Sequence, residues 1–221
     1  MRRYVGGRVF LGLAHYPVYN KNREIITTSV TNLDIHDIAR CGATYDVAGY
    51  YIIHPHPAQR AIVTELLAFW REGFGGEYNP DRKEALARLR LAASLDDAER
   101  EILAGGEGRL LRVVTDARAF PQSVSYQRLR SLLTPAEASR GRAAAPADGA
   151  ADSTGSPVGA EPDYFLLFGT GYGLTEDVIA AADLVLAPVL GRGDYNHLPV
   201  RGAAAIILDR LLGPAWWRET F

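Results

Sequence analysis

The stretch that decides the fold is DYFLLFGTGYGL, residues 163–174. Its apolar run from Tyr164 to Phe168 is followed by three alternating glycines, Gly169, Gly171 and Gly173. A continuous apolar run of this length, bounded by glycine, is typical of a strand buried on both faces, as in a parallel sheet. Glycines after such a strand let the backbone take positive φ and let a ligand approach its amides. The stretch therefore predicts a buried strand that ends in a ligand-binding loop.

A second loop of the same kind follows in the chain. The strand predicted at 184–187 stops at Pro188, and GRGDYNHLPV, residues 191–200, leads into the helical pattern RGAAAIILDRLLG. Pro199 suits the first helical turn, and Gly213 suits the end of the helix. Leu198 offers no side-chain cap, so we expect the first-turn amides to point at a loop or a ligand. Both loops follow strands at their carboxyl ends, where open α/β sheets bind ligands.

The amino-terminal strand is expected at about 9–15, and it leads into the polar loop HYPVYNKNREI, residues 15–25. Tyr16, Tyr19 and Asn20 should therefore lie near the same ligand-binding edge, as substrate-binding candidates. The alternative is an ordinary connection with a hairpin-like turn around residues 20–23.

The next segment, TTSVTNLDIHDIARCG (residues 27–42), predicts a helix. Thr31 followed three residues later by Asp34 resembles a capping box. Ile35 and Ile38 lie on one apolar face, whereas His36 and Arg40 lie four residues apart on another. Those polar residues are either a solvated face or part of a site.

The rest of the chain alternates strand and helix patterns. Further strands are predicted at 49–55, 89–92 and 110–118, with a helix at about 58–70 and helix caps at Ser94 and Ser125. Residues 136–162 are rich in alanine, glycine, proline and serine with almost no large apolar residue. Such a segment cannot bury enough surface to offset its ordering entropy, so we expect a disordered surface insertion.

Composition restricts the class of protein. A chain of 221 residues suits one domain, and a net charge of -2 argues against a dominant polyanion-binding surface while leaving room for a local basic patch. Cys41 is the only cysteine, which excludes an intramolecular disulfide and fits the cytoplasm. No apolar stretch approaches the roughly 20 residues of a membrane helix. The HPHP segment at 54–57 has no third ligand nearby, so we expect no metal site.

Several of these segments carry a family resemblance. FGTGYGL, LVLAPV and NHLPVRGAAAIILDRLL resemble the second and third motifs of the SPOUT methyltransferases. HYPVYNK, TNLDIHDIAR, EYNPDRKEAL and GDYNHLPVR are similar to segments of a bacterial SPOUT family usually described as RNA methyltransferases. The match runs from about residue 11 to residue 213. The resemblance implies an α/β fold: a Rossmann-like, mostly parallel sheet flanked by helices, with a carboxyl-terminal deep trefoil knot. Residues 9–213 would form a single domain, interrupted by the insertion.

The resemblance also implies a cofactor and partners. The cofactor would be S-adenosylmethionine, held mainly by backbone groups of the two glycine-bearing loops. The substrate would be RNA (tRNA or rRNA), and two copies of the chain would pair through their knots as a homodimer. The cofactor-binding candidates are Phe168, Gly169, Thr170, Gly171, Gly173, Pro188, Gly191, Asn196, His197, Leu198 and Val200.

Methyl transfer from a sulfonium centre needs no metal, but the acceptor must be aligned and its proton removed. The ionisable candidates near the predicted loop ends are Asp34, His36, Arg40 and Asp194. In ribose-methylating members of the superfamily, the first motif contains an asparagine and an arginine, which Asn32 and Arg40 match. A ribose acceptor would use Arg40 to stabilise an alkoxide, whereas a base nitrogen would use one of the carboxylates or His36 as the base. Both acceptors stay open.

Two rival classes remain from the sequence. One is an RNA-associated or ribosome-associated factor that binds S-adenosylmethionine without turnover. The other is an unrelated nucleotide-binding α/β protein, which fits poorly because the glycines lie late in the chain and do not form the GxGxxG fingerprint after a first strand.

Overall fold

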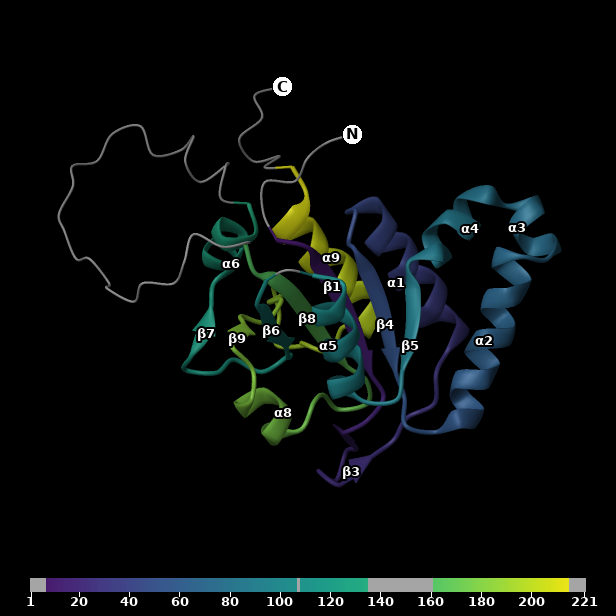
Figure 1. Ribbon diagram of the computed structural model, residues 1–221. Helices are drawn as coiled ribbons and strands as arrows, with labels where there is room; N and C mark the ends of the chain where they lie inside the picture. The colour runs from purple at the N-terminus through teal and green to yellow at the C-terminus, as the bar shows by residue number, and fades with distance from the viewer. Residues whose placement is uncertain (1–6, 107, 135–160, 215–221) are drawn as a thin grey trace.

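The computed structural model describes residues 7–106, 108–134 and 161–214 (Figure 1). The predicted insertion at 136–162 lies outside the described residues, apart from its last two. The elements, in chain order, are β1 (Val9–Ala14), β2 (Val18–Tyr19), β3 (Ile25–Ile26), α1 (Asn32–Thr44), β4 (Gly49–Ile53), α2 (Pro57–Arg71), α3 (Phe74–Tyr78), α4 (Pro80–Ala87), β5 (Leu89–Ala92), α5 (Leu95–Ala104), β6 (Leu110–Thr115), β7 (Ser123–Val124), α6 (Tyr126–Leu133), β8 (Asp163–Gly169), α8 (Glu176–Ala180), β9 (Leu184–Leu186) and α9 (Val200–Leu212).

The centre of the fold is a parallel sheet of seven strands in the order β5-β4-β1-β8-β6-β9-β7. Every pairing within this sheet is parallel. β8, the strand predicted from the deciding stretch, lies between β1 and β6. The predicted class, a mostly parallel α/β sheet, is therefore confirmed. A separate two-stranded hairpin, β2-β3, projects from the end of β1 (Figure 1).

Alternation along the central strands creates two apolar cores, one on each side of the sheet. On β1, Leu11 and Leu13 face one core and Phe10 faces the other. On β8, Leu166 faces the first core and Phe165 faces the second. Both faces of these strands are buried, which explains why their sequences are continuous apolar runs.

Helices cover the two faces unequally. α1, α2, α4, α6 and α9 supply residues to the first core, and α5 and α8 supply residues to the second. The first-face helices also contact one another, α1 lying between α4 and α9 (Figure 1). Since each helix follows a parallel strand, the amino termini of α1, α2, α6, α8 and α9 lie at the carboxyl edge of the sheet.

Most helix boundaries follow from local signals. Thr31, Ser94 and Ser125 each accept a hydrogen bond from a first-turn amide at their helix, as predicted. One detail was wrong: Pro199 is the N-cap residue of α9 and precedes its first turn. The predicted absence of a side-chain cap on α9 is confirmed, so its first amides need another partner.

α9 packs against α1, α6 and β8. Tyr45 Oη, beside the end of α1, donates a hydrogen bond to Asp209 Oδ1 of α9 at 3.0 Å. Ala204, Leu208 and Leu211 are buried, whereas Ile206 is half-buried. Much of the apolar circumference predicted for this helix is therefore covered within the chain.

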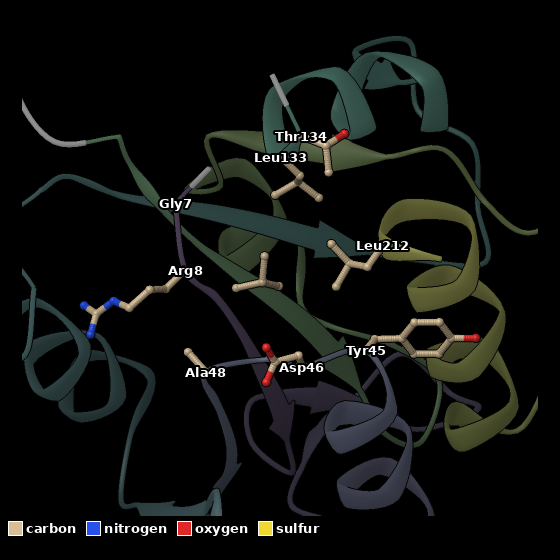
Figure 2. Close-up of a pocket in the computed structure, with 9 residues that line it drawn as sticks. Gly7, Arg8, Tyr45, Asp46, Ala48, Leu133, Thr134 and Leu212 are labelled. Atoms are coloured by element: carbon tan, nitrogen blue, oxygen red, sulfur yellow. The ribbon is translucent and has the colours of Figure 1, made fainter. Parts of the chain in front are cut away.

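A cavity of about 190 Å³ lies at the amino edge of the sheet, lined by Gly7, Arg8, Val9, Tyr45, Asp46, Ala48, Leu133, Thr134 and Leu212 (Figure 2). The Arg8 side chain points away from it and pairs with Asp163 instead. This edge is opposite the glycine-bearing loops, so the cavity is separate from the site described below. Within the described residues, no helix is long and apolar enough to span a bilayer.

Candidate functional site

Three loops meet at the carboxyl edge of the sheet. We name them the glycine loop (residues 170–175, after β8), the β6 loop (residues 116–122) and the β9 loop (residues 187–199). They follow three neighbouring strands, in the sheet order β8-β6-β9. Parallel strands bring such loops to a common edge, as the sequence predicts.

The glycine loop is closed by its own backbone and by the β2-β3 hairpin. Gly171 and Gly173 both adopt positive φ, at 60° and 95°. Tyr19 forms hydrogen bonds with the loop in both directions: its amide donates to Gly173 O at 2.9 Å and its carbonyl accepts from Tyr172 N at 2.8 Å. A Cβ on Gly171 would lie 2.7 Å from Tyr19 O. This glycine is thus needed for contact with the hairpin.

Two predicted substrate residues have structural roles in that hairpin. The Tyr19 ring lies 4.0 Å from the Arg23 guanidinium, and its hydroxyl accepts from the amide of Glu176 at 3.4 Å. Asn20 Oδ1 accepts from the amides of Asn22 and Glu24 and so closes the turn. The structure therefore favours the hairpin alternative for both residues.

Below the hairpin, polar side chains join β1, β4 and β8. Thr28 Oγ1 contacts Thr170 Oγ1 and lies 3.1 Å from His15 Nδ1, while Thr28 O accepts from His54 Nε2 at 3.0 Å. His54 Nδ1 accepts from His56 N, which fixes the neutral His54 ring as the Nε2-protonated tautomer. Burial, with a smaller contribution from His54, lowers the pKa of His15 to about 4.

The His15 ring is therefore neutral at physiological pH. Its Nε2 is buried and, within the described residues, has no hydrogen-bond partner. Among the described residues, no group of three or more His, Cys, Asp or Glu side chains that could hold a metal ion occurs. The histidine and threonine side chains instead connect the hairpin loop to the glycine loop.

The β6 loop contacts both of its neighbours. The Asp116 side chain, 4% exposed, is paired with Arg118, and its Oδ2 would lie 3.2 Å from a Cβ on Gly173. Asn196 of the β9 loop donates from Nδ2 to Ala117 O at 2.6 Å. Asp116 thus places a buried carboxylate beside the glycine loop, and sequence analysis missed it.

The β9 loop is open. Within the described residues, none of the amides of 189–198 donates to a backbone or side-chain acceptor of the chain. A Cβ on Gly191 would meet nothing within 4 Å. His197 packs edge-on against Tyr195, and Leu198 is exposed. Unused backbone donors at an uncapped helix terminus are a suitable surface for a polar ligand.

Asp34 and Arg201 face each other where α1 and α9 begin. Asp34 is 6% exposed; its Oδ2 accepts from Thr31 Oγ1 at 2.7 Å. Asp34 Oδ1 lies 3.6 Å from Arg201 Nη1 and, within the described residues, has no hydrogen bond. Arg201 also lies 3.5 Å from Asp37. One oxygen of this buried carboxylate therefore accepts no hydrogen bond within the described residues.

The other predicted catalytic residues do not join Asp34. His36 lies on another face of α1, in edge contact with Trp70 of α2 at 5.4 Å. Arg40 is exposed, six residues further along the helix. At about 1.5 Å rise per residue, it lies roughly 9 Å below Asp34 along the helix axis. Asp194 is exposed in the β9 loop.

Tyr16 and Asn32 are exposed at the carboxyl edge and stay candidates for substrate contact. Arg201 was missed although one signal was available. A cation in the first turn of a helix opposes the helix dipole, so it needs a local carboxylate partner. Asp34 and Asp37 supply that partner.

S-adenosylmethionine bound at these loops would meet two kinds of feature, backbone groups and open space beside glycines. Phe168 is buried, so only its main chain could contribute, and Thr170 is already bonded to Thr28 and Ala14 O. The β9 loop offers free amides and open space at Gly191 and Gly193. Free amides and open space at the β9 loop are the features that a nucleoside bound there would meet, and the glycine loop would form a fixed wall beside it.

Comparison with known proteins identifies the family. A family model described as SAM-dependent RNA methyltransferase matches residues 8–140 and 150–213. The chain belongs to this family. It is accordingly a SPOUT methyltransferase that uses S-adenosylmethionine and acts on RNA.

Relatives agree with the family assignment. An "uncharacterized protein" of Aquifex aeolicus is 38% identical over 207 residues, which cover 94% of this chain and 89% of that protein. A protein of Oleidesulfovibrio alaskensis named tRNA (guanine-N(1)-)-methyltransferase is 36% identical over 214 residues, covering 97% of this chain but only 44% of that protein. This chain therefore spans less than half of that relative, whose name describes the whole protein.

Among solved structures, an Aquifex aeolicus TrmH/SpoU tRNA modifying enzyme superposes with a TM-score of 0.50 at 13% identity, covering 96% of this chain and 75% of that one. At this identity the likeness supports the fold of the methyltransferase and nothing finer.

Proposed function

We propose that this methyltransferase methylates a base nitrogen of tRNA or rRNA and that Asp34 accepts the proton from that nitrogen. The observation that carries the proposal is the free oxygen of Asp34, which is buried beside the start of α9. A base nitrogen that carries a proton needs such an acceptor before it can act as a nucleophile. The name of the Oleidesulfovibrio relative, tRNA (guanine-N(1)-)-methyltransferase, supports a base as acceptor.

The cofactor supplies an activated methyl group on a sulfonium sulfur. The base nitrogen would take up that methyl group and give its proton to Asp34 Oδ1. Arg201, 3.6 Å from Oδ1, orients the carboxylate, and Thr31 fixes its second oxygen. The β9 loop would hold the cofactor through its amides, with the glycine loop and Asp116 as the opposite wall.

The assembly belongs to the same proposal. We propose that the chain from β8 to α9 forms the trefoil knot, supported by the place of β8 between β1 and β6 and by the packing of α9 on α1. Residues 9–213 would form one domain with an insertion at 136–162. Two copies would pair through the knots in the cytoplasm, and the half-buried Ile206 on α9 leaves apolar surface for that contact.

Ribose methylation is the second candidate function. The observation in its favour is the exposed guanidinium of Arg40, which the same SPOUT resemblance makes a candidate for stabilising an alkoxide. Within one chain it lies away from Asp34, so this route would need Arg40 from a second copy.

The test is methylation of unmodified bulk bacterial tRNA and rRNA with labelled S-adenosylmethionine, followed by nucleoside analysis. We expect a base-methylated nucleoside. Asp34→Asn should lower the rate by about 10²–10⁴-fold while cofactor affinity stays at the parent value. Asp97→Asn, an exposed carboxylate on α5 paired with Arg100, is the matched control and should keep parent activity.

A 2′-O-methylated nucleoside, or full activity of Asp34→Asn, would contradict the proposal. Cofactor binding with no methylated nucleoside from either RNA would instead favour a factor that binds without turnover.

A further inference from the structure

A basic cluster lies on the outer surface of α1 and α4, on a different face of α1 from Asp34. We name it the Trp70 cluster, and it consists of His36 and Arg40 on α1, Trp70 on α2 and Arg82 on α4. α1 packs along α4, and α2 also contacts α4, which brings the three helices together (Figure 1). Two of these residues were predicted as catalytic, but the structure places both here.

Trp70 contacts two side chains of the cluster, those of Arg82 and His36. The Arg82 guanidinium lies over its ring at 4.8 Å, and the His36 ring meets it edge-on at 5.4 Å with an interplanar angle of 80°. A stacked guanidinium loses rotational freedom but keeps its outward N–H donors. Burial and then the positive charge of Arg82 lower the pKa of His36; Asp37 opposes this by raising it, and Arg40 makes a smaller lowering contribution. Both guanidinium groups therefore lie close enough to the His36 ring to act on it, as does one carboxylate.

The cluster is not neutralised by the chain. Among the described residues, neither Arg40 nor Arg82 has a carboxylate within ion-pair distance. The acidic residues nearest on the same helices are Asp37, Asp81 and Glu84; Asp37 is paired with Arg201, and the other two are exposed on α4.

The arginines around α5 behave differently. Near α5 and the strands β5 and β6, Arg90, Arg100, Arg109 and Arg112 each form an ion pair with a carboxylate at 2.6–3.3 Å. The two cluster arginines therefore differ from those four, whose charges are compensated within the chain.

Two polar atoms of the cluster also lack partners. Arg82 Nε and His36 Nδ1 are inaccessible to solvent and, within the described part of the chain, form no hydrogen bond. Buried polar groups without a partner are uncommon in folded proteins. Two such groups around one tryptophan make the cluster a candidate for a ligand contact.

We propose that the Trp70 cluster binds the phosphodiester backbone of the RNA substrate. Guanidinium groups donate two parallel hydrogen bonds to phosphate oxygens, and an aromatic support fixes their plane. His36 lies two residues after Asp34, about 3 Å further along the helix axis but about 200° around it, so the two side chains leave opposite sides of the first turns of α1. An RNA strand that passes around the amino terminus of α1 would contact the cluster on one side and present a nearby nucleotide to Asp34 on the other. The inference rests on RNA as the substrate but not on the role of Asp34.

Fluorescence anisotropy with labelled bulk bacterial tRNA as the probe, at several salt concentrations, tests this. Phosphate contacts are sequence-independent, so the probe reports on the cluster whichever RNA is methylated. Arg82→Gln and Arg40→Gln should each weaken binding by about threefold to tenfold and lower the slope of log K against log salt by about 1. Arg82→Lys should keep the slope, because the charge remains, while affinity falls.

Arg100→Gln is the matched control: it removes an exposed arginine that is ion-paired, on α5 at the opposite face, and should leave affinity and slope unchanged. Cofactor affinity, from calorimetry, should stay at the parent value in every variant. Arg40 is exposed, so Arg40→Gln tests the proposal even where Arg82→Gln lowers the melting temperature.

Parent affinity and slope in both glutamine variants would overturn the proposal, as would a parent protein that does not bind the probe. A change of mass by light scattering in the variants would also overturn it and assign the surface to contact between copies of the chain. Loss of methylation in Asp34→Asn with intact tRNA binding separates the two proposals, since it concerns the reaction and not the cluster.

Discussion

The glycine loop and the β9 loop leave the sheet at the same edge, yet they are built in opposite ways. In the glycine loop, Gly171 and Gly173 have positive φ, and the backbone is bonded to the β2-β3 hairpin. In the β9 loop, the glycines have open space around them, and the amides of residues 189–198 donate to no acceptor in the described part of the chain. The comparison teaches that glycine serves two purposes here. One loop uses it to fold tightly, and the other uses it to leave room.

The largest effect is expected for Gly171→Val, which tests whether the glycine loop depends on glycine to fold tightly. A side chain at φ 60° with its Cβ 2.7 Å from Tyr19 O strains the backbone and separates the hairpin from the loop. We expect a loss of about 4 kcal/mol in the free energy of unfolding, measured by urea denaturation. Cofactor binding should fall as well, as a consequence of the distorted loop.

Gly191→Ala is the paired variant on the open loop. Its added Cβ meets nothing within 4 Å, so the free energy of unfolding should stay within about 0.5 kcal/mol of the parent. Equal losses in the two variants would remove the distinction between the loops.

The pH dependence of stability tests the buried polar contacts beneath the glycine loop, which include His15. The pKa of His15 is lowered to about 4 in the folded state, so the unfolded chain binds more protons as the pH falls below the ordinary histidine value of about 6.5. The contribution of His15 to the free energy of unfolding is fully present above about pH 6.5, and it falls by up to about 3 kcal/mol as the pH approaches 4. Burial lowers the pKa values of His54 and His36 too, which adds to the same direction.

Urea denaturation at several pH values between 4 and 7 measures this effect. His15→Gln should show a shallower decline than the parent. A decline of the same steepness in both proteins would mean that His15 is not the group responsible.

Arg201→Gln tests the link from the open loop to Asp34. Because Arg201 is in the first turn after the β9 loop and lies 3.6 Å from Asp34 Oδ1, its loss should leave the carboxylate less well oriented. We expect the turnover rate to fall by about tenfold, with a smaller change in cofactor affinity. Arg201→Lys should recover part of the rate, and the pH–rate profile should shift only in the glutamine variant. An unchanged rate in Arg201→Gln would show that Asp34 is positioned by Thr31 alone.

The smallest effect is expected for Thr170→Val, which removes the hydroxyl that joins the glycine loop to Thr28 and Ala14 O. The shape is nearly kept, so the loss should be about 1 kcal/mol. Thr134→Val is the control, because within the described residues the Thr134 hydroxyl bonds only to Arg130 O of its own helix. If Thr170→Val lost less free energy of unfolding than this control, the contact between Thr170 and Thr28 would not contribute to stability.

Sequence predicted the features that depend on neighbours along the chain. The strand at β8, the cap at Thr31 and the uncapped start of α9 were all expected, because apolar runs and cap residues act over a few positions. Tyr19 and Asn20 were offered as substrate residues with a hairpin as the alternative, and the structure favours the hairpin.

What could not be predicted depends on residues far apart in sequence. Asp34 and Arg201 meet only because α1 and α9 pack side by side. The same packing joins Tyr45 to Asp209, which lie 164 residues apart in the sequence. The face of α1 that carries His36 and Arg40 was predicted, but not that α4 and Trp70 would lie against it. Helical periodicity separates faces; only tertiary packing says what each face meets.

The place of β8 in the sheet has a consequence for biosynthesis. β1 and β6 are made early, but the strand that pairs with both arrives late: Arg8, beside β1, and Asp163, at the start of β8, are 155 residues apart. Until then, the nascent chain carries two unpaired strand edges at the middle of its future sheet. Long-range parallel pairing is slow, and unpaired edges favour aggregation, so folding should benefit from chaperone protection until β8 inserts.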